Sequence, residues 1–371
     1  MKILFVTPLY PPQIGGPATY AKLLVDELPK RGHGVTLVKF SNFTWLPSGL
    51  RHMAIFGHVF LESFSHDMIF AQDVFSVGFP AALAAQFAGK KFVVRVPGDY
   101  AWEQGTQKFG VSDSIDDFQK KKYSWRVELL RSIQKFVVRS ADTVIAPSAY
   151  FANMVQGWLF TPSLSRGQDA KKVHAIYNGI DISRIQEFSK KTYQLATISY
   201  KLVSAGRLVP WKEFGSLIKI VAKNPTWKLT LVGDGPEKEH LQNLAQALGC
   251  TARVIFDKAL PQEKLWETIA QADAFVLSSS FESFSYQAVE AMALGVPVVA
   301  TNACNMEEII TNNETGILVP VKNDEALEIA LTQLFGDGSL REKIGTAGAR
   351  RAEDFSILRT ITELVNLLNS L

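Results

Sequence analysis

Two glutamates eight residues apart are the side chains that most restrict the chemistry of this chain. They are Glu282 and Glu290. The apolar run before them predicts a short buried strand over 274–279, and the pattern after them predicts a helix over 284–294 that Gly295 closes. Glu282 is then expected where the strand becomes the helix, and Glu290 about two turns further along.

The predicted start of that helix favours an anion, because its free N–H groups and the positive end of the helix dipole are exposed there. Carboxylates repel phosphate but accept hydrogen bonds from hydroxyls. A ligand that carries both phosphates and sugar hydroxyls, such as a nucleotide sugar, fits the combination. Alternatively, Glu282 stabilises a first helical turn and Glu290 faces solvent, which is a common use of acids. The pair alone leaves both interpretations open.

Length and composition predict two globular domains. A chain of 371 residues is too long for one average domain, and 47% hydrophobic residues are ample for packed cores. The formal net charge of +3 is too small to indicate nucleic acid as the main partner. Cys250 and Cys304 show no metal-type spacing, and neither a signal peptide nor a membrane span is indicated. We therefore expect a cytoplasmic protein.

Apolar β-branched runs alternate with helical patterns along the chain, which is typical of parallel, doubly wound sheets. The strands predicted for the first half are 2–7, 35–40, 67–71, 91–96, 143–147 and 173–177. Those for the second half are 201–205, 228–232, 253–256, 274–277, 298–300 and 316–319. Two such series predict two Rossmann-like domains with an interdomain cleft, and ligands of open α/β sheets bind at the carboxyl ends of the strands.

A glycine pair follows the first predicted strand. Gly15 and Gly16 precede a predicted helix over 18–28. Glycines at a helix start let the backbone approach a ligand closely, and the helix start attracts its charge. A plain structural turn is the alternative. The segment is neither a P-loop nor a Gly-x-Gly-x-x-Gly fingerprint, which disfavours an ATPase or a dehydrogenase.

Two cations follow the first predicted strand of the second half. Arg207 and Lys212 lie just after Gly206. A guanidinium and an ammonium at a strand end can together neutralise a diphosphate leaving group. Two surface cations on a loop are the alternative interpretation. Their co-occurrence with the Glu282 segment at one sheet edge favours the diphosphate site.

The chain resembles retaining glycosyltransferases of family 4, which have the GT-B fold. The motifs cover nearly the whole chain and occur in the family's order. They are Gly15-Gly16, Asn178-Gly179-Ile180-Asp181, Gly206-Arg207-Leu208 with Lys212, Val232-Gly233-Asp234-Gly235-Pro236, Glu282 with Glu290, and Thr315-Gly316-Ile317-Leu318-Val319. The resemblance implies an acceptor domain over 1–180, a donor domain over 181–354, and a final helix in 355–371 that crosses back to the first domain.

The resemblance also implies roles for the site residues. Arg207 and Lys212 hold the donor diphosphate, and Glu290 binds the ribose hydroxyls. Glu282 contacts a hydroxyl of the transferred sugar. Further donor contacts are implied for Gly15, Gly16, Ser283, Phe284 and Ser285. The leaving phosphate helps to deprotonate the acceptor, so no protein base is strictly required.

The sequence departs from the family pattern at several positions. Many relatives have a histidine after the fourth strand, and we carry its catalytic role to Asp99, for which turn capping is the alternative. Glu213 stands where relatives usually have glycine, and 303–305 replaces their Gly-Gly. Asp257 replaces another expected glycine, which puts base recognition in doubt.

We expect no cofactor and no metal, because the sequence contains no Asp-x-Asp and no ligand-like histidine spacing. The expected partners are a UDP-, GDP- or ADP-sugar donor and a glycan or lipid-linked acceptor. Segment 120–139 has seven cations, one acid and helical apolar spacing, so it could contact the inner, anionic face of a membrane. A helix packed on its own domain is the alternative.

Three functions account for these features. The first is a metal-independent, retaining hexosyltransferase that acts in cell-surface glycan or lipid-linked saccharide synthesis. The second is a sugar-nucleotide epimerase on the same scaffold, against which Glu282, Glu290 and the two cations argue. The third is a non-catalytic nucleotide-sugar binder, which has the same ligand-holding residues.

Overall fold

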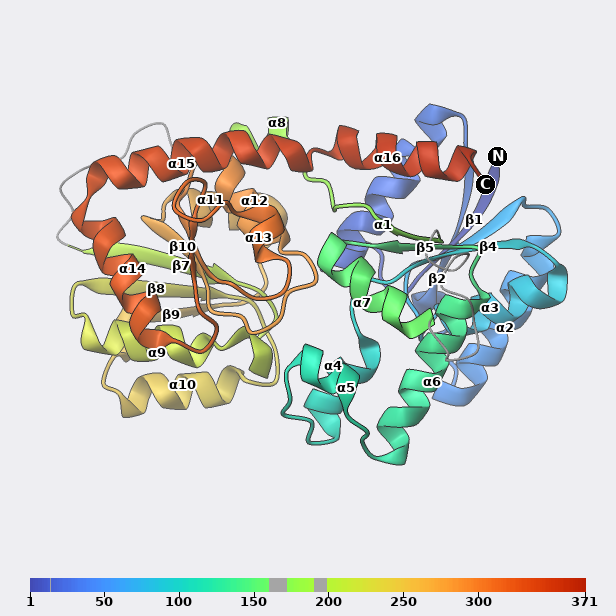
Figure 1. Cartoon of the computed structure of the whole chain (residues 1–371), viewed down its shortest axis with the longest axis horizontal. Helices are drawn as coiled ribbons and strands as arrows, with labels where there is room; N and C mark the ends of the chain where they lie inside the picture. The colour runs from blue at the N-terminus through green and yellow to red at the C-terminus, as the bar shows by residue number, and fades with distance from the viewer. Residues whose placement is uncertain (14, 160–171, 190–198) are drawn as a thin grey trace. The chain divides into compact units, whose positions relative to one another are not determined.

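The protein folds into two compact units (Figure 1). The computed structural model describes residues 1–13, 15–159, 172–189 and 199–371. The first unit comprises Met1–Gly179 with Leu358–Leu371, and the second comprises Ile180–Ile357. The chain returns to the first unit at 357/358, whereas we placed this boundary at 354/355.

The first unit contains a six-stranded sheet with the order β2-β1-β3-β4-β5-β6. All its strand pairs are parallel. The strands are β1 (Lys2–Thr7), β2 (Gly34–Lys39), β3 (Met68–Ala71), β4 (Lys91–Arg95), β5 (Thr143–Ala146) and β6 (Val173–Ala175). Strands β3 and β5 are buried along their whole length, as expected for a parallel sheet covered on both faces.

Helices cover both faces of this sheet. They are α1 (Gly16–Glu27), α2 (Ser48–Ser63), α3 (Gly78–Ala88), α4 (Tyr100–Lys108), α5 (Ile115–Lys120), α6 (Trp125–Ser140), α7 (Ala149–Leu159) and α16 (Ile357–Asn369). Parallel strands are joined by right-handed crossovers. The crossover from β1 to β2 moves across the sheet in the direction opposite to that of the later crossovers. Helix α1 therefore lies on one face, and α2, α3, α6 and α7 lie on the other. Contacts between α2 and α3, α3 and α6, and α6 and α7 agree with this layer.

The second unit contains another six-stranded parallel sheet, with the order β12-β11-β10-β7-β8-β9. Counted within the unit, this is the 3-2-1-4-5-6 order of dinucleotide-binding folds. The strands are β7 (Tyr200–Ala205), β8 (Trp227–Val232), β9 (Val254–Asp257), β10 (Ala274–Leu277), β11 (Val298–Thr301) and β12 (Ile317–Val319). The helices are α8 (Ile182–Gln186), α9 (Phe214–Lys223), α10 (Lys238–Ala247), α11 (Gln262–Ala270), α12 (Tyr286–Ala293), α13 (Met306–Ile309), α14 (Asp324–Gly336) and α15 (Gly338–Ala352).

The predicted fold class is confirmed, since both halves form doubly wound parallel sheets. Two helix predictions need correction. Helix α12 begins at Tyr286 rather than 284, because the Ser285 side chain caps it by accepting a hydrogen bond from the Ala288 N–H at 3.4 Å. The single helix expected over 120–139 is interrupted, because α5 ends at Lys120 and α6 begins at Trp125.

Within the described ranges, no helix has the length and apolar character required to cross a bilayer.

Gly233 ends β8 where the chain passes very close to the loop after β7. Its φ is 151°, and a Cβ at this position would lie 1.9 Å from the carbonyl oxygen of Gly206. No side chain fits there without movement of the backbone. The close approach keeps the loops after β7 and β8 in contact at the carboxyl edge of the sheet.

We therefore expect Gly233→Ala to destabilise the protein by about 3 kcal/mol, since it combines a clash with a strained backbone conformation. Chemical denaturation measures the change. Gly336→Ala is the matched control, because a Cβ at this helical position meets nothing within 4 Å. A Gly233→Ala variant as stable as the Gly336→Ala variant would contradict the assigned role.

Candidate functional site

The carboxyl ends of β7 and β10 lie where the strand order of the second sheet reverses. Strands β8 and β9 follow on one side of β7, and β10, β11 and β12 lie on the other. Loops that leave two such neighbouring strands diverge and form a crevice, which is where ligands of open α/β sheets bind. Gly206 follows β7 and Ser278 follows β10. The structure therefore brings Arg207, Lys212 and Glu282, which follow these two strands, to this reversal point.

Lys212 and Glu282 are in direct contact there. The Lys212 Nζ lies 2.5 Å from Glu282 Oε1, and the two side chains are only 11% and 8% exposed. The same oxygen accepts a hydrogen bond from Ser279 Oγ at 2.8 Å. Breaking a buried ion pair leaves an uncompensated charge, so the two groups fix each other's position. An incoming anion can bind the Lys212 ammonium only by competing with the Glu282 carboxylate.

The loop after β10 positions Lys212. Ser278 Oγ lies within hydrogen-bond distance of the backbone oxygens of Lys212 and Glu213, at 2.9 and 3.0 Å. A Cβ at Gly206 would lie 3.4 Å from the Lys212 Cε, so Gly206 leaves room for the lysine stem. Arg207 is exposed directly after Gly206, at the same strand end.

Glu213 has a φ of 51°, in the left-handed region that favours glycine. Cys304, inside the segment that replaces the relatives' Gly-Gly, has a φ of 55°. Both departures from the family pattern thus keep a backbone conformation that glycine adopts without strain. At each position the non-glycine residue costs of order 1 kcal/mol in backbone strain, and both positions lie next to the carboxyl edge of the sheet.

Glu290 lies in the middle of α12 and is almost completely buried. Gln262 Nε2 donates a hydrogen bond to Glu290 Oε1. The second oxygen, Oε2, has no hydrogen-bond partner among the described side chains and backbone. Burial raises the pKa of Glu290 to about 8, and the neighbouring Trp266 and Gln262 side chains lower it only in part. Glu290 is therefore not the solvent-facing acid of the alternative interpretation.

The residues between the two glutamates have structural contacts of their own. The Phe284 ring packs against Tyr286 at 5.5 Å and against Phe355 at 5.8 Å. Ser285 caps α12, and Ser283 is half-buried. These contacts hold the backbone between the glutamates in place, while the predicted donor contacts of Ser283, Phe284 and Ser285 stay predictions.

Asp99 lies in the first unit, completely buried at the start of α4. One oxygen accepts hydrogen bonds from the Trp102 N–H and from Gln134 Nε2, both at 3.0 Å. The other accepts from Gln119 Nε2 at 2.8 Å. Burial raises the pKa of Asp99 above its usual range. These contacts are those of a helix cap, the alternative we considered, and the catalytic role has no contact here that supports it.

Gly15 and Gly16 lie at the reversal point of the first sheet, between β1 and β3. Gly15 has a φ of 145° and precedes α1, whose first turn contains no acid. Gln72, which follows β3, donates to the Pro17 carbonyl at 2.7 Å and accepts from Thr7 Oγ1 at 2.8 Å. The start of α1 is thereby held at the carboxyl edge of this sheet.

The sequence interpretation assigned no site role to three residues of the second unit, and it named a fourth, Asn305, only as part of the segment 303–305. Gln262 and Trp266 lie four residues apart on α11 and therefore share one face of the helix. This spacing identifies them as site residues only when their proximity to Glu290 is already known. Ser279 was expected only as part of a strand. Asn305 occupies the N-cap position of α13 but does not cap it. Its side chain is completely buried, and neither polar atom has a partner among the residues that the structure describes.

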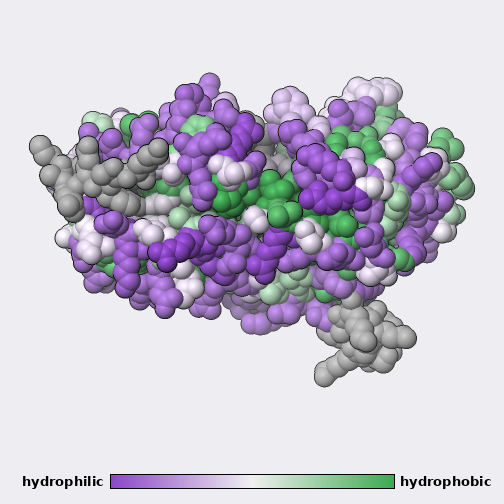
Figure 2. Space-filling view, turned by 90° about the horizontal axis from the view of Figure 1, so that it is seen from above, coloured by the Kyte–Doolittle hydropathy of each residue, from purple (hydrophilic) through white to green (hydrophobic). Residues whose placement is uncertain are grey.

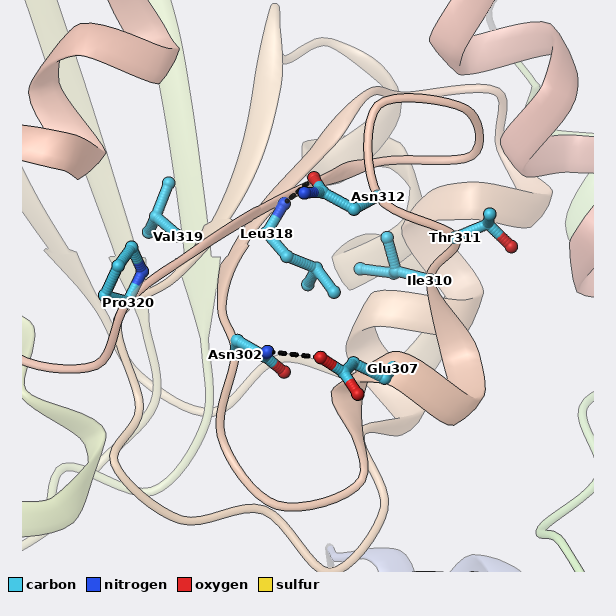
Figure 3. Close-up of a pocket in the computed structure, with 8 residues that line it drawn as sticks. All are labelled: Asn302, Glu307, Ile310, Thr311, Asn312, Leu318, Val319 and Pro320. Carbon is cyan, nitrogen blue, oxygen red and sulfur yellow. Dashed lines mark hydrogen bonds between the residues drawn. The ribbon is translucent and has the colours of Figure 1, made fainter.

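A pocket of about 560 Å³ lies beside the ends of β11 and β12 (Figure 3). Its lining residues are Asn302, Glu307, Ile310, Thr311, Asn312, Leu318, Val319 and Pro320. Asn302 Nδ2 donates to Glu307 Oε1 at 2.5 Å, and Asn312 Oδ1 accepts from the Leu318 N–H at 2.9 Å. Asn302 and Glu307, which flank Asn305 in the chain, thus line a pocket of mixed polar and apolar character at the same sheet edge. None of the predicted site residues lines it.

Two family models match successive parts of the chain. Residues 38–179 match the Glycosyl transferase 4-like domain, and residues 185–351 match Glycosyl transferases group 1. The chain carries the two domains of a GT-B glycosyltransferase. It is 32% identical over 212 residues to the lipopolysaccharide core biosynthesis glycosyltransferase LpsE of Rhizobium meliloti, a match over 57% of this chain and 58% of that protein.

An uncharacterized glycosyltransferase of Methanocaldococcus jannaschii is 26% identical over 93% of this chain and 91% of its own length. By contrast, the matches to the first curated relatives cover about half of those proteins. Among solved structures, HepE of Anabaena in complex with UDP has a TM-score of 0.74 at 20% identity, with both chains fully covered. Sucrose-phosphate synthase of Thermosynechococcus elongatus has a TM-score of 0.78 at 18% identity and covers 100% of this chain and 98% of its own.

Within the part of the chain that the structure describes, no three His, Cys, Asp or Glu side chains form a group that could hold a metal ion. Metal independence remains a prediction, because the diphosphate of a bound substrate can itself supply ligands to a metal.

The raised pKa of Glu290 makes protein stability depend on pH, and this dependence can test whether the carboxyl is buried. In the unfolded chain this carboxyl ionises near its ordinary value of 4.5, and in the folded chain near 8. Between these values the folded state binds more protons, so stability falls as pH rises, by at most about 1.4 kcal/mol per pH unit. Glu290→Gln removes this contribution. Its stability relative to the wild type should therefore increase from about pH 4.5 to about pH 8 and stay constant above that.

Denaturant unfolding at several pH values across this window measures the difference. Glu325→Gln, at an exposed position in the first turn of α14, controls for the change in net charge. A Glu290→Gln variant whose relative stability does not vary with pH would show that the carboxyl is not buried as described.

Proposed function

We propose that the protein is a retaining, metal-independent hexosyltransferase that transfers a sugar from a nucleotide-sugar donor to an acceptor hydroxyl. The observation that carries the proposal is the contact between Lys212 and Glu282 at the reversal point of the second sheet, with Arg207 at the same strand end. Cations and a hydroxyl-binding carboxylate at one sheet edge suit a ligand in which a diphosphate adjoins a sugar. The two family models support the glycosyltransferase part of the proposal.

The proposed reaction breaks the bond between the anomeric carbon and the diphosphate oxygen and forms a bond from that carbon to the acceptor oxygen on the same face. The acceptor proton passes to the leaving diphosphate. Arg207 and Lys212 neutralise the charge that develops on the diphosphate, which is the main task of such a site. Glu282, released from Lys212, binds a hydroxyl of the sugar.

Glu290 is proposed to bind the ribose. Its Oε2 is a buried oxygen with no hydrogen-bond partner among the described groups, and such a polar atom is costly until a partner reaches it. A ribose hydroxyl, which can both donate and accept, supplies that partner. The Asn305 carboxamide is a second buried group of this kind, and we propose that it contacts a hydroxyl of the ligand.

We propose only the chemical classes of the donor and the acceptor. UDP-, GDP- and ADP-sugars are the candidate donors, and a glycan or lipid-linked saccharide of the cell surface is the acceptor class. HepE of Anabaena was solved with UDP-glucose, and LpsE acts in lipopolysaccharide core biosynthesis, so UDP-sugars are the first donors to test. A cytoplasmic location with peripheral contact to an anionic membrane suits a lipid-linked acceptor.

Thermal-shift measurements with UDP, GDP, ADP and their sugars identify the nucleotide, and release of free nucleoside diphosphate measures activity. We expect one base to stabilise the protein and its sugar donor to be cleaved. A non-catalytic nucleotide-sugar binder would be stabilised by one base but would not cleave its sugar donor. An epimerase converts the sugar without releasing diphosphate. Failure to cleave any stabilising donor, with glycan and lipid-linked acceptors present, would refute the transferase assignment.

Variants of the two glutamates should separate their roles. We expect Glu290→Ala to weaken nucleoside diphosphate binding by roughly tenfold or more, because it removes the buried hydrogen-bond partner of a ribose hydroxyl. Glu282→Ala should mainly lower kcat, by on the order of tenfold to a hundredfold, with diphosphate affinity unchanged or higher since Lys212 loses its competing partner.

Calorimetry with the preferred nucleoside diphosphate and steady-state kinetics check both expectations. Glu325→Ala on the exposed side of α14 is the control. Equal and small effects of Glu282→Ala and Glu290→Ala would argue against the assigned roles.

A further inference from the structure

Large apolar side chains are exposed along α2, an outer helix of the first unit. Leu50, Met53 and Leu61 lie on this helix and Phe64 follows it, and their exposed fractions are between 53% and 71%. Figure 2 shows hydrophobic groups among hydrophilic ones on the surface of the first unit, at the right of the view. We call these four residues and Gly57, which lies between them, the α2 strip. An exposed apolar surface that is concentrated along one helix marks a binding face.

The spacing of the α2 strip is the same in both directions along the helix. Successive positions are three, four, four and three residues apart, so the strip lies on one side of α2 with Gly57 at its centre. Ile55, Val59 and Ser63, on another side, are buried. When the helix is turned end over end, the strip presents the same row of positions. Such a surface matches a second copy of itself that runs in the opposite direction.

Gly57 is a glycine that the fold of one copy does not require. It lies in a helix interior, where every residue except proline is more favourable than glycine. A Cβ at this position would meet nothing within 4 Å. The absence of a side chain at the centre of the α2 strip lets another backbone approach closely. Gly57 is therefore the position at which a second helix can cross α2 at the shortest distance.

The charges around the α2 strip also match a second copy. Helix α2 contains one cation, Arg51, and one acid, Glu62, and the neighbouring α3 contains neither. The two charges lie near opposite ends of α2 and on the same flank of the strip, because eleven residues complete about three turns. An antiparallel partner centred on Gly57 brings its Glu62 to the level of Arg51, to within one residue. A bilayer would meet a neutral helix, whereas interfacial helices are rich in cations.

The apolar surface is large enough for a stable contact. Trp45, just before α2, and Phe87, near the end of α3, are 78% and 72% exposed. The Phe87 ring lies 6.0 Å from the Phe56 ring of α2, between centroids. If each of the six large side chains presents on the order of 100 Å², together they provide roughly 600 Å². With a polar rim, this approaches the about 800 Å² that each partner contributes to a standard interface.

We propose that the α2 strip is the contact surface of a homodimer, in which α2 packs antiparallel on α2 of a second copy about a two-fold axis at Gly57. Leu50 then meets Phe64 of the second copy, Met53 meets Leu61, and Gly57 meets itself. Arg51 and Glu62 form two symmetric ion pairs at the rim. The contact uses residues of the first unit alone and does not depend on the proposed transferase activity.

Sedimentation of the full chain tests the proposal, at concentrations from about 0.5 to about 100 µM, which cover the weaker affinities of interfaces of this size. The wild type should change from monomer to dimer within this range. The double variant Leu61→Ser/Phe64→Ser should weaken the dimer by on the order of a hundredfold or more, because a two-fold axis places each substitution in the interface twice. A variant that dimerises as the wild type does would overturn the proposal.

The matched control is Ile255→Ser/Ile329→Ser in the second unit, whose side chains are 52% and 50% exposed. It should dimerise as the wild type does. Both double variants change exposed residues, and an unchanged thermal unfolding midpoint confirms that each is folded.

Two variants of Gly57 test the position of the axis. Gly57→Glu and Gly57→Lys should each fold, since the position is open, and each should be monomeric, since like charges meet at the axis. A mixture of the two variants should recover the dimer, because the opposite charges then face each other. A mixture that stays monomeric would contradict an axis at Gly57.

A wild type that remains monomeric at the highest concentration would overturn the homodimer. If phosphatidylcholine vesicles with roughly one-third phosphatidylglycerol then bind the wild type but not the Leu61→Ser/Phe64→Ser variant, the α2 strip is assigned to a bilayer instead. Donor cleavage measured on the same samples reports separately on the transferase proposal, because the variants leave the second unit unchanged.

Discussion

The parallel pairing of β7 with β10 is the constraint on which the candidate site depends. Ala274 pairs with Leu202, 72 residues earlier in the chain, and the other neighbours of the two strands lie on opposite sides. Their following loops therefore part, and Lys212 from one loop meets Glu282 from the other. An ion pair with so little exposure contributes little net stability, because desolvation offsets most of the attraction. Its effect is positional, since it sets a cation and a carboxylate side by side where a charged ligand can exchange with either.

Buried polar groups without partners among the described residues are the second feature of the candidate site in the second unit. A fold optimised for stability alone would pair the Glu290 and Asn305 side chains or replace them with apolar residues. Glu290 is instead held by Gln262 through one oxygen, while burial keeps its proton to unusually high pH. The positive φ of Glu213 and Cys304 adds backbone strain at the same sheet edge. Such accumulated cost is typical of sites whose favourable interactions are completed by a ligand.

The first unit divides its polar and apolar groups differently. The Asp99 and Gln72 side chains form their hydrogen bonds within the unit, where they fix the starts of α4 and α1. Its outer helix α2 exposes the large apolar side chains Leu50, Met53 and Leu61. The second unit thus presents a charged candidate site with unmet hydrogen bonds, and the first exposes an apolar helix face. Both arise from the same doubly wound plan, in which the sheet edge provides the site and the helical layers provide the outer faces.

The sequence by itself determined the two doubly wound sheets, because hydrophobic runs and turn residues are local patterns that fix where each strand begins and ends. It also located Gly206, Lys212 and Glu282 in the loops that follow strands and Glu290 within the next helix, since those positions follow from the same pattern. Only the tertiary structure decided which groups touch. Contacts between distant segments determine that Lys212 pairs with Glu282 and that Gln262 donates a hydrogen bond to the buried Glu290. They also determine that Asp99 accepts a hydrogen bond from Gln134 besides capping its helix. The exposure of Leu50, Met53 and Leu61 on α2 was likewise undecided, because an apolar residue on a helix is buried or exposed according to what packs against it, and no local pattern contains that information.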